Sequence, residues 1–330
     1  MPSALSFPGP RISRALALAG ICLILGGCSI RKLAINAVAD TLAGGASVFA
    51  QDEDPELVAQ ALPFALKTLE ALLAEAPENR NLLLSACSGF TQYAYAFVET
   101  EAFFVEPEDF RQARRLRKRA LRLYLRGRDY CVDGLETLRP EIRRDLVLEP
   151  EGTAASLGRE SLDLIYWTAA SWGAAISVGL DRPELVADLP VVRSLLERAV
   201  TLDETFQQGA LHEAMIALAA LPEALGGSQQ QARTHFERAR ELSGGRSAAP
   251  YVTLARTVSV ANQDRSEFER LLHQALEVDV EADRDRRLAN VLAQRQAEEL
   301  LRRVDDYFFA SEEDFESEDP VAPGAERESP

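Results

Sequence analysis

The sequence is poor in the residues that most often carry enzyme chemistry or bind metals. It has 3 His and 4 Cys among 330 residues, with no CxxC motif. His212-Glu213 resembles the start of a zinc-protease motif, but Ile216 stands where the second histidine is required. His235 and His273 have no evident ligand partners, and the GxSxG, GxGxxG and Walker A motifs are absent. We therefore expect no catalytic residue, no metal site and no cofactor.

Basic charge is in the minority. The chain has 36 Lys+Arg against 52 Asp+Glu, which gives a formal net charge of -16. Phosphate contacts need a basic surface, so this balance argues against a nucleic-acid partner. Hydrophobic residues make up 47% of the chain and charged residues 27%. These values are close to those of folded globular domains and argue against disorder throughout.

A long apolar run occurs only at the N-terminus. Two arginines precede the apolar stretch 15–25, whose 11 residues are too few for a transmembrane helix of about 20. The ending Leu-Gly-Gly-Cys at 25–28 resembles the lipobox of exported bacterial lipoproteins, in which the cysteine is acylated. The pattern predicts a signal peptide over 1–27 and lipidation at Cys28. Two or more acyl chains hold a protein stably on a membrane.

The predicted anchor also indicates a location. Ser29, rather than aspartate, follows the acylated cysteine. By resemblance to proteobacterial sorting rules, this residue favours the outer membrane. We therefore expect a lipid-anchored protein on the periplasmic face of the cell envelope, in the outer membrane.

The mature chain keeps two cysteines, Cys87 and Cys131. Both lie in apolar-rich stretches with helical spacing and not at a metal-ligand spacing. We expect two buried thiols, although an oxidising periplasm also allows a bridge between them.

Alternating strand patterns are scarce, and apolar residues recur at three- and four-residue steps through nearly the whole mature chain. Asp54-Pro55 combines an N-cap with a proline at the first helical position. Glu-Pro and Gly-Gly pairs interrupt the pattern elsewhere. The fold is thus predicted to be all-α, with helices at about 55–76, 79–104, 107–132, 158–179, 183–202, 206–220, 228–242, 248–261, 265–278 and 284–309.

Weak internal repeats favour a particular architecture over an ordinary helical bundle. Ala232, Phe236 and Ala239 have the small–large–small spacing of the second helix of a tetratricopeptide repeat. Looser versions begin in three other predicted helices, at Ala65, Val192 and Phe268. The spacing predicts a right-handed helical-hairpin solenoid of divergent tetratricopeptide-like repeats over 28–309. Solenoids of this kind usually bind a partner on their concave surface.

The C-terminal segment differs from this body in composition. Residues 305–330 hold ten acidic groups, Arg327 and three prolines, with little apolar content after Phe309. We predict an acidic, disordered tail over 310–330. Much of the negative charge of the chain is therefore expected outside the folded body.

The basic residues of the body gather in one predicted helix. Nine positions between Arg111 and Arg128 are Arg or Lys, and an apolar stripe runs through the same segment. The ordinary interpretation is a solvated helix face paired with acidic residues elsewhere. The alternative is docking to an acidic partner or to anionic headgroups. The candidate docking residues are Arg114, Arg115, Lys118 and Arg122.

Aromatic residues gather in two predicted helices. Phe90, Tyr93 and Phe97 recur at helical spacing, and both tryptophans lie in the run 166–175 among small residues. Small residues indicate a tight hairpin core or, alternatively, the wall of an apolar cavity. Trp167 and Trp172 are about 140° apart around a helix, so we expect only one of them to line a cleft. The full set of candidate cleft residues is Phe90, Tyr93, Phe97, Tyr166, Trp167, Trp172 and Tyr251.

The order of several runs resembles the TatT component family of tripartite ATP-independent periplasmic (TRAP) transporters. The similarity covers about residues 28–309. The matching runs are Cys28–Gly45, Val48-Phe49, Asp54–Val58, Gly89–Ala94, Tyr166–Ala175, Pro183–Val186, Gly209–Glu213, Ser243–Gly245, Pro250–Val252 and Gln263–Arg265.

This resemblance implies an exported helical lipoprotein built on cryptic tetratricopeptide-like repeats. It also implies association with the periplasmic solute-binding protein of a TRAP transporter, an internal hydrophobic passage and a trimeric state. We therefore expect a non-enzymatic accessory protein that handles a small apolar or amphipathic solute together with that binding protein. The alternative is a structural scaffold lipoprotein of envelope assembly without a ligand.

Overall fold

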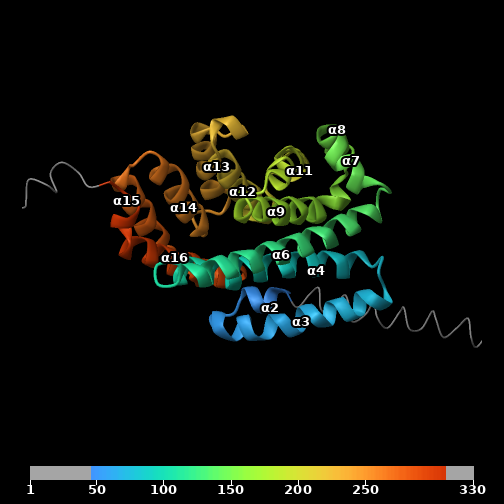
Figure 1. Ribbon diagram of the computed structural model, residues 1–330, viewed down its shortest axis with the longest axis horizontal. Helices are drawn as coiled ribbons and strands as arrows, with labels where there is room; N and C mark the ends of the chain where they lie inside the picture. Colours follow the sequence, from blue (N-terminus) through green and yellow to red (C-terminus); the bar gives the residue numbers. More distant parts are fainter. Residues whose placement is uncertain (1–45, 310–330) are drawn as a thin grey trace, which may run out of the picture. The chain divides into compact units, whose positions relative to one another are not determined.

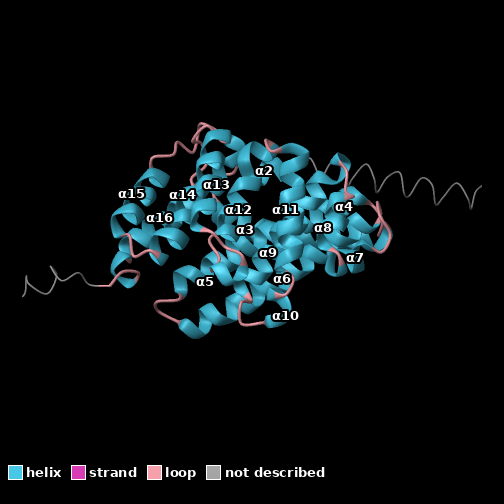
Figure 2. Cartoon of the chain, turned by 90° about the horizontal axis from the view of Figure 1, so that it is seen from above, coloured by secondary structure: helices cyan, strands magenta, loops and turns pink. Residues whose placement is uncertain are grey.

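The computed structural model describes residues 46–309, and within them every regular element is a helix (Figure 2). The prediction of an all-α fold is confirmed. The predicted signal peptide, the lipidation site Cys28 and the acidic tail over 310–330 lie outside the described residues.

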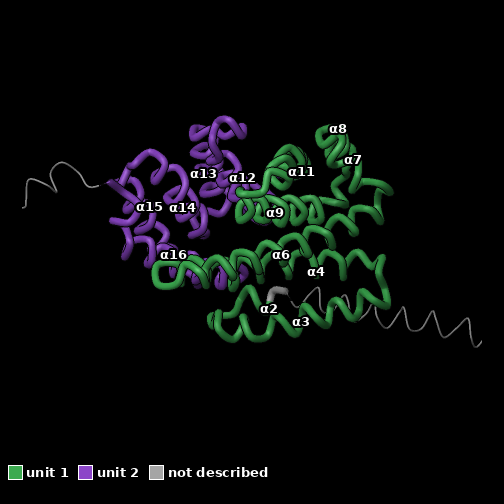
Figure 3. The backbone as a smooth tube through the Cα atoms, viewed as in Figure 1, with its two compact units in different colours: residues 1–203 green, residues 204–330 purple. Residues whose placement is uncertain are grey.

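The chain divides into two compact units, residues 1–203 and 204–330 (Figure 3). We call them unit 1 and unit 2. The arginine-rich helix and both tryptophans belong to unit 1, whereas all three histidines belong to unit 2.

Unit 1 is built from long helices that pack on one another in chain order (Figure 1). α4 (Arg80–Tyr93) packs on α3 (Pro55–Glu75) and on α6 (Phe110–Glu136). α9 (Leu162–Val178) packs on α6 and on α11 (Leu189–Asp203). Shorter helices complete the unit: α2 (Ala46–Ala50), α5 (Thr100–Val105), α7 (Ile142–Leu148), α8 (Pro150–Ala155), the 3-10 turn η2 (Arg159–Ser161) and α10 (Pro183–Val186).

Side-chain caps fix where these helices begin. Asp54 Oδ1 accepts a hydrogen bond from the Leu57 amide at 3.0 Å, and Pro55 is the first residue of α3. Asn79 and Asp109 accept the equivalent bond at α4 and α6, at 3.0 and 2.8 Å. Each cap satisfies an amide that has no partner inside the helix. The predicted N-cap at Asp54 is confirmed.

α3 has the length and composition of a membrane-spanning helix. In the structure it packs on α4 through a buried face that includes Val58, Leu66 and Leu69. Leu57 and Phe64 on its other side are 56% and 80% exposed.

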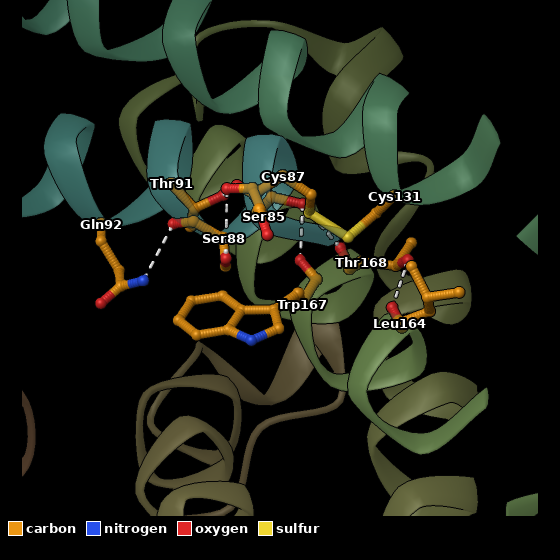
Figure 4. Close-up of a disulfide and its surroundings, with 10 residues drawn as sticks. Ser85, Cys87, Ser88, Thr91, Gln92, Cys131, Leu164, Trp167 and Thr168 are labelled. Atoms are coloured by element: carbon orange, nitrogen blue, oxygen red, sulfur yellow. Dashed lines mark hydrogen bonds between the residues drawn. A yellow bond between two sulfur atoms is a disulfide. The ribbon is translucent and has the colours of Figure 1, made fainter. Parts of the chain in front are cut away.

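α4 and α6 approach each other closely. A Cβ atom on Gly127 would lie 2.7 Å from Thr91 Oγ1 and 3.0 Å from the Cys87 carbonyl oxygen, so this position requires glycine. Cys87 and Cys131, both fully buried, form a disulfide between the two helices, with their Cα atoms 5.3 Å apart (Figure 4). The expectation of two free thiols is therefore wrong, because helix packing brings together cysteines that lie 44 residues apart.

Unit 2 is a second series of packed helices. α12 (Ala210–Ala219) packs on α13 (Gln229–Leu242), and α14 (Ala249–Leu254) packs on α13 and on α15 (Arg265–Leu276). α16 (Arg287–Arg302) packs on α15 and on α14. The remaining turns are 3-10 helices: η3 (Phe206–Gly209), η4 (Glu223–Leu225), η6 (Arg284–Arg286) and η7 (Val304–Asp306).

Two helices contain a π-helical segment. η1 (Ala94–Glu99) continues α4 into α5, and η5 (Ala255–Ser259) continues α14. At the end of η1 the Thr100 hydroxyl donates to the Tyr95 carbonyl at 2.9 Å. π-Helical turns of this kind are frequent at functional sites.

The predicted repeat positions are buried in α11, α13 and α15, whereas Ala65 and Leu72 of α3 are only half-buried. Ala232, Phe236 and Ala239 are at most 6% exposed, and the corresponding positions of α11 and α15 are at most 2% exposed. The spacing therefore identifies the packed face of these helices correctly. The right-handed solenoid stacking of tetratricopeptide-like repeats stays a prediction.

Candidate functional site

Four of the nine cations of the arginine-rich helix α6 are held by other groups: Arg117, Arg119, Arg126 and Arg128. Arg117 makes a bidentate ion pair with Glu106, with N–O distances of 2.6 and 2.5 Å. This pair raises the pKa of Arg117 above its usual value. Arg126 forms an ion pair with Glu70 of α3. For Arg117 and Arg126, the ordinary interpretation of a helix face paired with acidic residues elsewhere in the chain is confirmed.

Two of these held arginines also lie over aromatic rings of α4. The guanidinium carbon of Arg126 is 4.9 Å from the ring centre of Phe90, and that of Arg119 is 5.6 Å from Tyr93. Arg119 also donates to the Tyr93 hydroxyl at 3.2 Å. Such cation–π contacts are worth about 0.5–2 kcal/mol each. They fasten α6 to α4.

Glu70 joins α3 to α6. It accepts a hydrogen bond from Lys67 on α3, and one from the Tyr130 hydroxyl of α6 at 2.7 Å. Burial favours the neutral acid, but these bonds and the charge of Arg126 outweigh it and hold the pKa of Glu70 below its usual value. The Tyr130 ring in turn stacks on Phe90 of α4 at 5.8 Å.

The other five cations of α6 are exposed and make neither an ion pair nor a ring contact among the described residues; we call Arg111, Arg114, Arg115, Lys118 and Arg122 the basic stripe. Within it, Arg115 donates to the neutral amide of Gln112 at 2.5 Å. All four predicted docking residues belong to the basic stripe. Arg111 is an addition, since the sequence could not tell which of the nine cations would be paired.

The candidate cleft aromatics of unit 1 are mostly packed against neighbours. Phe90 and Tyr93 are 3% and 8% exposed, beneath the arginines of α6. Phe97, half-buried on η1, has its ring 5.9 Å from that of Tyr93. The structure thus brings these three predicted residues together along α4 and η1.

The two tryptophans of α9 have different surroundings. Trp172 is 4% exposed, donates from Nε1 to Asp188 at 3.1 Å and lies 5.0 Å from the guanidinium of Arg128. Trp167 is half-buried, with its ring 5.0 Å from that of Tyr166; Figure 4 shows it with the residues around the disulfide. That one of the two tryptophans lines a cleft stays a prediction.

Tyr251 lies in unit 2 and lines a pocket of about 290 Å³. Its ring is 8% exposed and packs edge-to-face on Phe236 at 5.2 Å. Burial raises the pKa of the hydroxyl above its usual value. The pocket offers charged groups of both signs, and its lining consists of Gly245, Arg246, Tyr251, Gln274, Glu277, Val278, Asp279 and Ala282.

Unit 2 contains a histidine pair that was not expected from the sequence. His212 Nδ1 of α12 lies 2.9 Å from His235 Nδ1 of α13, and His212 Nε2 lies 3.2 Å from Glu204. Arg238 donates to both carboxylate oxygens of Glu204 at 2.8 Å. The two histidines are 23 residues apart in the chain, and the α12–α13 hairpin brings them together, which the sequence spacing alone does not indicate.

Both histidines of this pair are neutral at pH 7. Burial lowers the pKa of both His212 and His235 below the usual value. Hydrogen bonds from Arg238 lower the pKa of Glu204 to about 2, so Glu204 is a carboxylate that accepts from His212. Among the described residues, no group of three or more His, Cys, Asp and Glu side chains is arranged to hold a metal ion.

Within residues 46–309 the chain has helices as its only regular elements, among them the arginine-rich α6. Its sequence matches the family described as TRAP transporter T-component over residues 51–308. A protein of Treponema pallidum described as uncharacterized is 30% identical over 306 residues, which cover 87% of this chain and 95% of the relative. The chain belongs to the TRAP transporter T-component family, as its resemblance to that family indicated.

Proposed function

We propose that this chain is a lipid-anchored, non-enzymatic accessory component of a TRAP transport system that binds the periplasmic solute-binding protein through the basic stripe of α6. The family gives the transport system. The observation that supports the docking surface is the exposure of five cations without a carboxylate partner among the described residues.

The stripe concentrates like charge along one helix face. Arg111 and Arg115, Arg114 and Lys118, and Lys118 and Arg122 are each four residues apart. Like charges at this spacing destabilise a helix by about 0.2–0.5 kcal/mol per pair. An acidic surface laid along α6 would relieve this repulsion and would speed encounter of the two proteins.

Binding of the solute-binding protein to immobilised mature chain tests the proposal. Reversal of charge at Arg114, Arg115 and Lys118 should weaken capture by at least about tenfold, since three exposed pairs turn into like-charge contacts. Capture should also lose most of its dependence on salt. A variant with charge reversal at Arg80 and Arg182, which are exposed elsewhere in unit 1, is the matched control. Equal capture by both variants would contradict the proposed surface.

We propose further that Cys28 is the lipid anchor and that the protein faces the periplasm from the outer membrane. The lipobox-like ending at 25–28 and Ser29 support this location. The predicted trimer remains part of the proposal, because family resemblance supports it.

A small solute is the remaining element of the proposal. The pocket beside Tyr251 suits an amphipathic molecule, because a tyrosine ring and Val278 adjoin Arg246, Glu277 and Asp279. Native mass spectrometry of purified protein should detect a copurified small molecule. The competing function, a scaffold without ligand, is favoured by the packing of Phe90, Tyr93 and Trp172 against their neighbours, and an empty protein in every preparation would support it.

A further inference from the structure

α3 carries apolar residues on two opposite sides, one buried and one exposed. Val58, Leu66 and Leu69 belong to the buried side, which packs on α4 (Figure 1). Leu57 and Phe64 are seven residues apart, which is close to two helical turns, so they share the other side. A helix that is apolar on opposite sides is normally covered on both. The exposed side of α3 therefore indicates a further, apolar partner.

We propose that this side of α3 rests on the surface of the lipid bilayer to which the chain is anchored. Its exposed apolar residues, which we call the apolar face, are Leu57, Ala61, Phe64 and Ala71. The choice of lipid as the partner rests on the proposed function, because it depends on the anchor at Cys28. The exposure of the apolar face does not depend on that anchor.

The position of the apolar face in the chain favours lipid over a protein partner. Val48 of α2 is 66% exposed and follows Cys28 by 20 residues, so it lies within about 70 Å of the acylated end. Three large apolar side chains, Val48, Leu57 and Phe64, are thus exposed between residues 46 and 64, next to the anchor.

The composition of α3 suits contact with acyl chains. Its mean hydropathy reaches 1.4 over an 18-residue window, a value typical of membrane helices. Interfacial helices bury their apolar face about 5–10 Å into the boundary between headgroups and acyl chains. An anchored protein meets its bilayer at a high effective concentration, so a small apolar face is sufficient for contact.

A fluorescence experiment measures the contact directly. In the mature chain Cys28 is the one cysteine outside the disulfide, so it can be coupled to a maleimide lipid in neutral phosphatidylcholine vesicles. Brominated acyl chains should quench the fluorescence added by Phe64→Trp severalfold more than that added by Leu148→Trp. Leu148 is the matched control, because it is 73% exposed on α7 of the same unit. Equal quenching of the two variants would overturn the proposal.

A second experiment measures the strength of the contact. One acyl chain alone gives marginal, reversible membrane binding, so an added apolar contact changes it measurably. With a single alkyl chain on Cys28, Leu57→Ser with Phe64→Ser should weaken vesicle binding by at least about tenfold, because two large apolar side chains leave the bilayer. Val147→Ser with Leu148→Ser should have little effect. About 1 M salt, which screens the basic stripe, should preserve the difference between the two pairs; equal binding by both pairs would overturn the proposal.

The outcomes separate this contact from the proposed anchor. An unmodified Cys28 in protein from native membranes, together with quenching in the coupled vesicles, would refute the anchor and support the contact. Acylated Cys28 without quenching would refute the contact alone. A second copy of the chain is the competing partner. If Leu57→Ser with Phe64→Ser dissolves an oligomer in sedimentation and quenching is absent, the apolar face joins copies of the chain and the inference is wrong.

Discussion

Reduction of the Cys87–Cys131 bridge should destabilise unit 1 without affecting unit 2. The bridge closes a chain segment of 44 residues between α4 and α6. In the chain-entropy description, a loop of this length loses about 13 cal/mol/K in the unfolded state, which corresponds to about 4 kcal/mol at 25 °C. For the 158 or so residues of unit 1 that are described, the entropy of unfolding is about 330 cal/mol/K, so the expected fall in Tm is about 12 °C.

The tryptophans allow this effect to be assigned to one unit. Both Trp167 and Trp172 lie on α9 of unit 1, and Trp172 contacts Arg128 of α6. Tryptophan fluorescence during urea unfolding therefore reports on unit 1. Reduced wild-type protein isolates the loss of the bridge, because it leaves both buried sulfur atoms in place and creates no cavity. The double variant Cys87→Ala and Cys131→Ala should be less stable still, since deletion of buried atoms adds to the loss.

The outcome that refutes this reasoning is specific. Suppose that mass spectrometry verifies complete reduction and the urea midpoint measured by tryptophan fluorescence does not change. The bridge then does not lower the conformational entropy of the unfolded chain by the amount calculated from its loop length. A shift of both units by the same amount would also contradict it, because unit 2 contains no cysteine.

Three further predictions concern other parts of the chain. Gly127→Ala should destabilise unit 1 by about 1–3 kcal/mol in urea unfolding, because the added Cβ would meet backbone and hydroxyl oxygens of α4. Gly173→Ala is the control and should have a small effect, because the nearest atom to its Cβ would be 3.3 Å away. Burial lowers the pKa of His212 and His235 in the folded protein. As pH drops below about 6.5, the unfolded chain therefore binds more protons than the folded chain, and the stability of unit 2 should fall. His235→Gln should flatten this pH dependence in circular dichroism. Cys28→Ala should move the protein from the membrane to the soluble fraction, and unchanged membrane retention would reject the lipobox interpretation.

The helices could be predicted where the apolar pattern is long. The stretch 79–104 was expected as one helix and is continuous through α4, η1 and α5, although its π-helical turns leave no sign in the spacing. α7 and α8 were not predicted, since Pro140 and Pro150 suggested interruptions whereas Pro150 is the first residue of α8. The predicted helix over 183–202 is divided into α10 and α11.

The contacts between distant residues could not be predicted. The disulfide and the histidine pair each depend on which helices pack together and in what rotation about their axes. The sequence identified the nine cations of α6, but their division into four that have partners and the five of the basic stripe follows from the positions of Glu70, Glu106 and the aromatic rings. The pocket beside Tyr251 likewise requires the packing of α14 and α15.

Two groups of cations on α6 follow different rules on substitution. Arg117 and Arg126 use the planar, forked guanidinium group in bidentate or ring-stacked contacts, which suit a guanidinium better than an ammonium group. The basic stripe requires only positive charge, and the one lysine among the nine cations, Lys118, belongs to it. Replacing arginine by lysine should therefore loosen the helix from its neighbours at the paired positions and have little effect in the stripe, so a single helix carries both residues that need a particular side-chain shape and residues that need only charge.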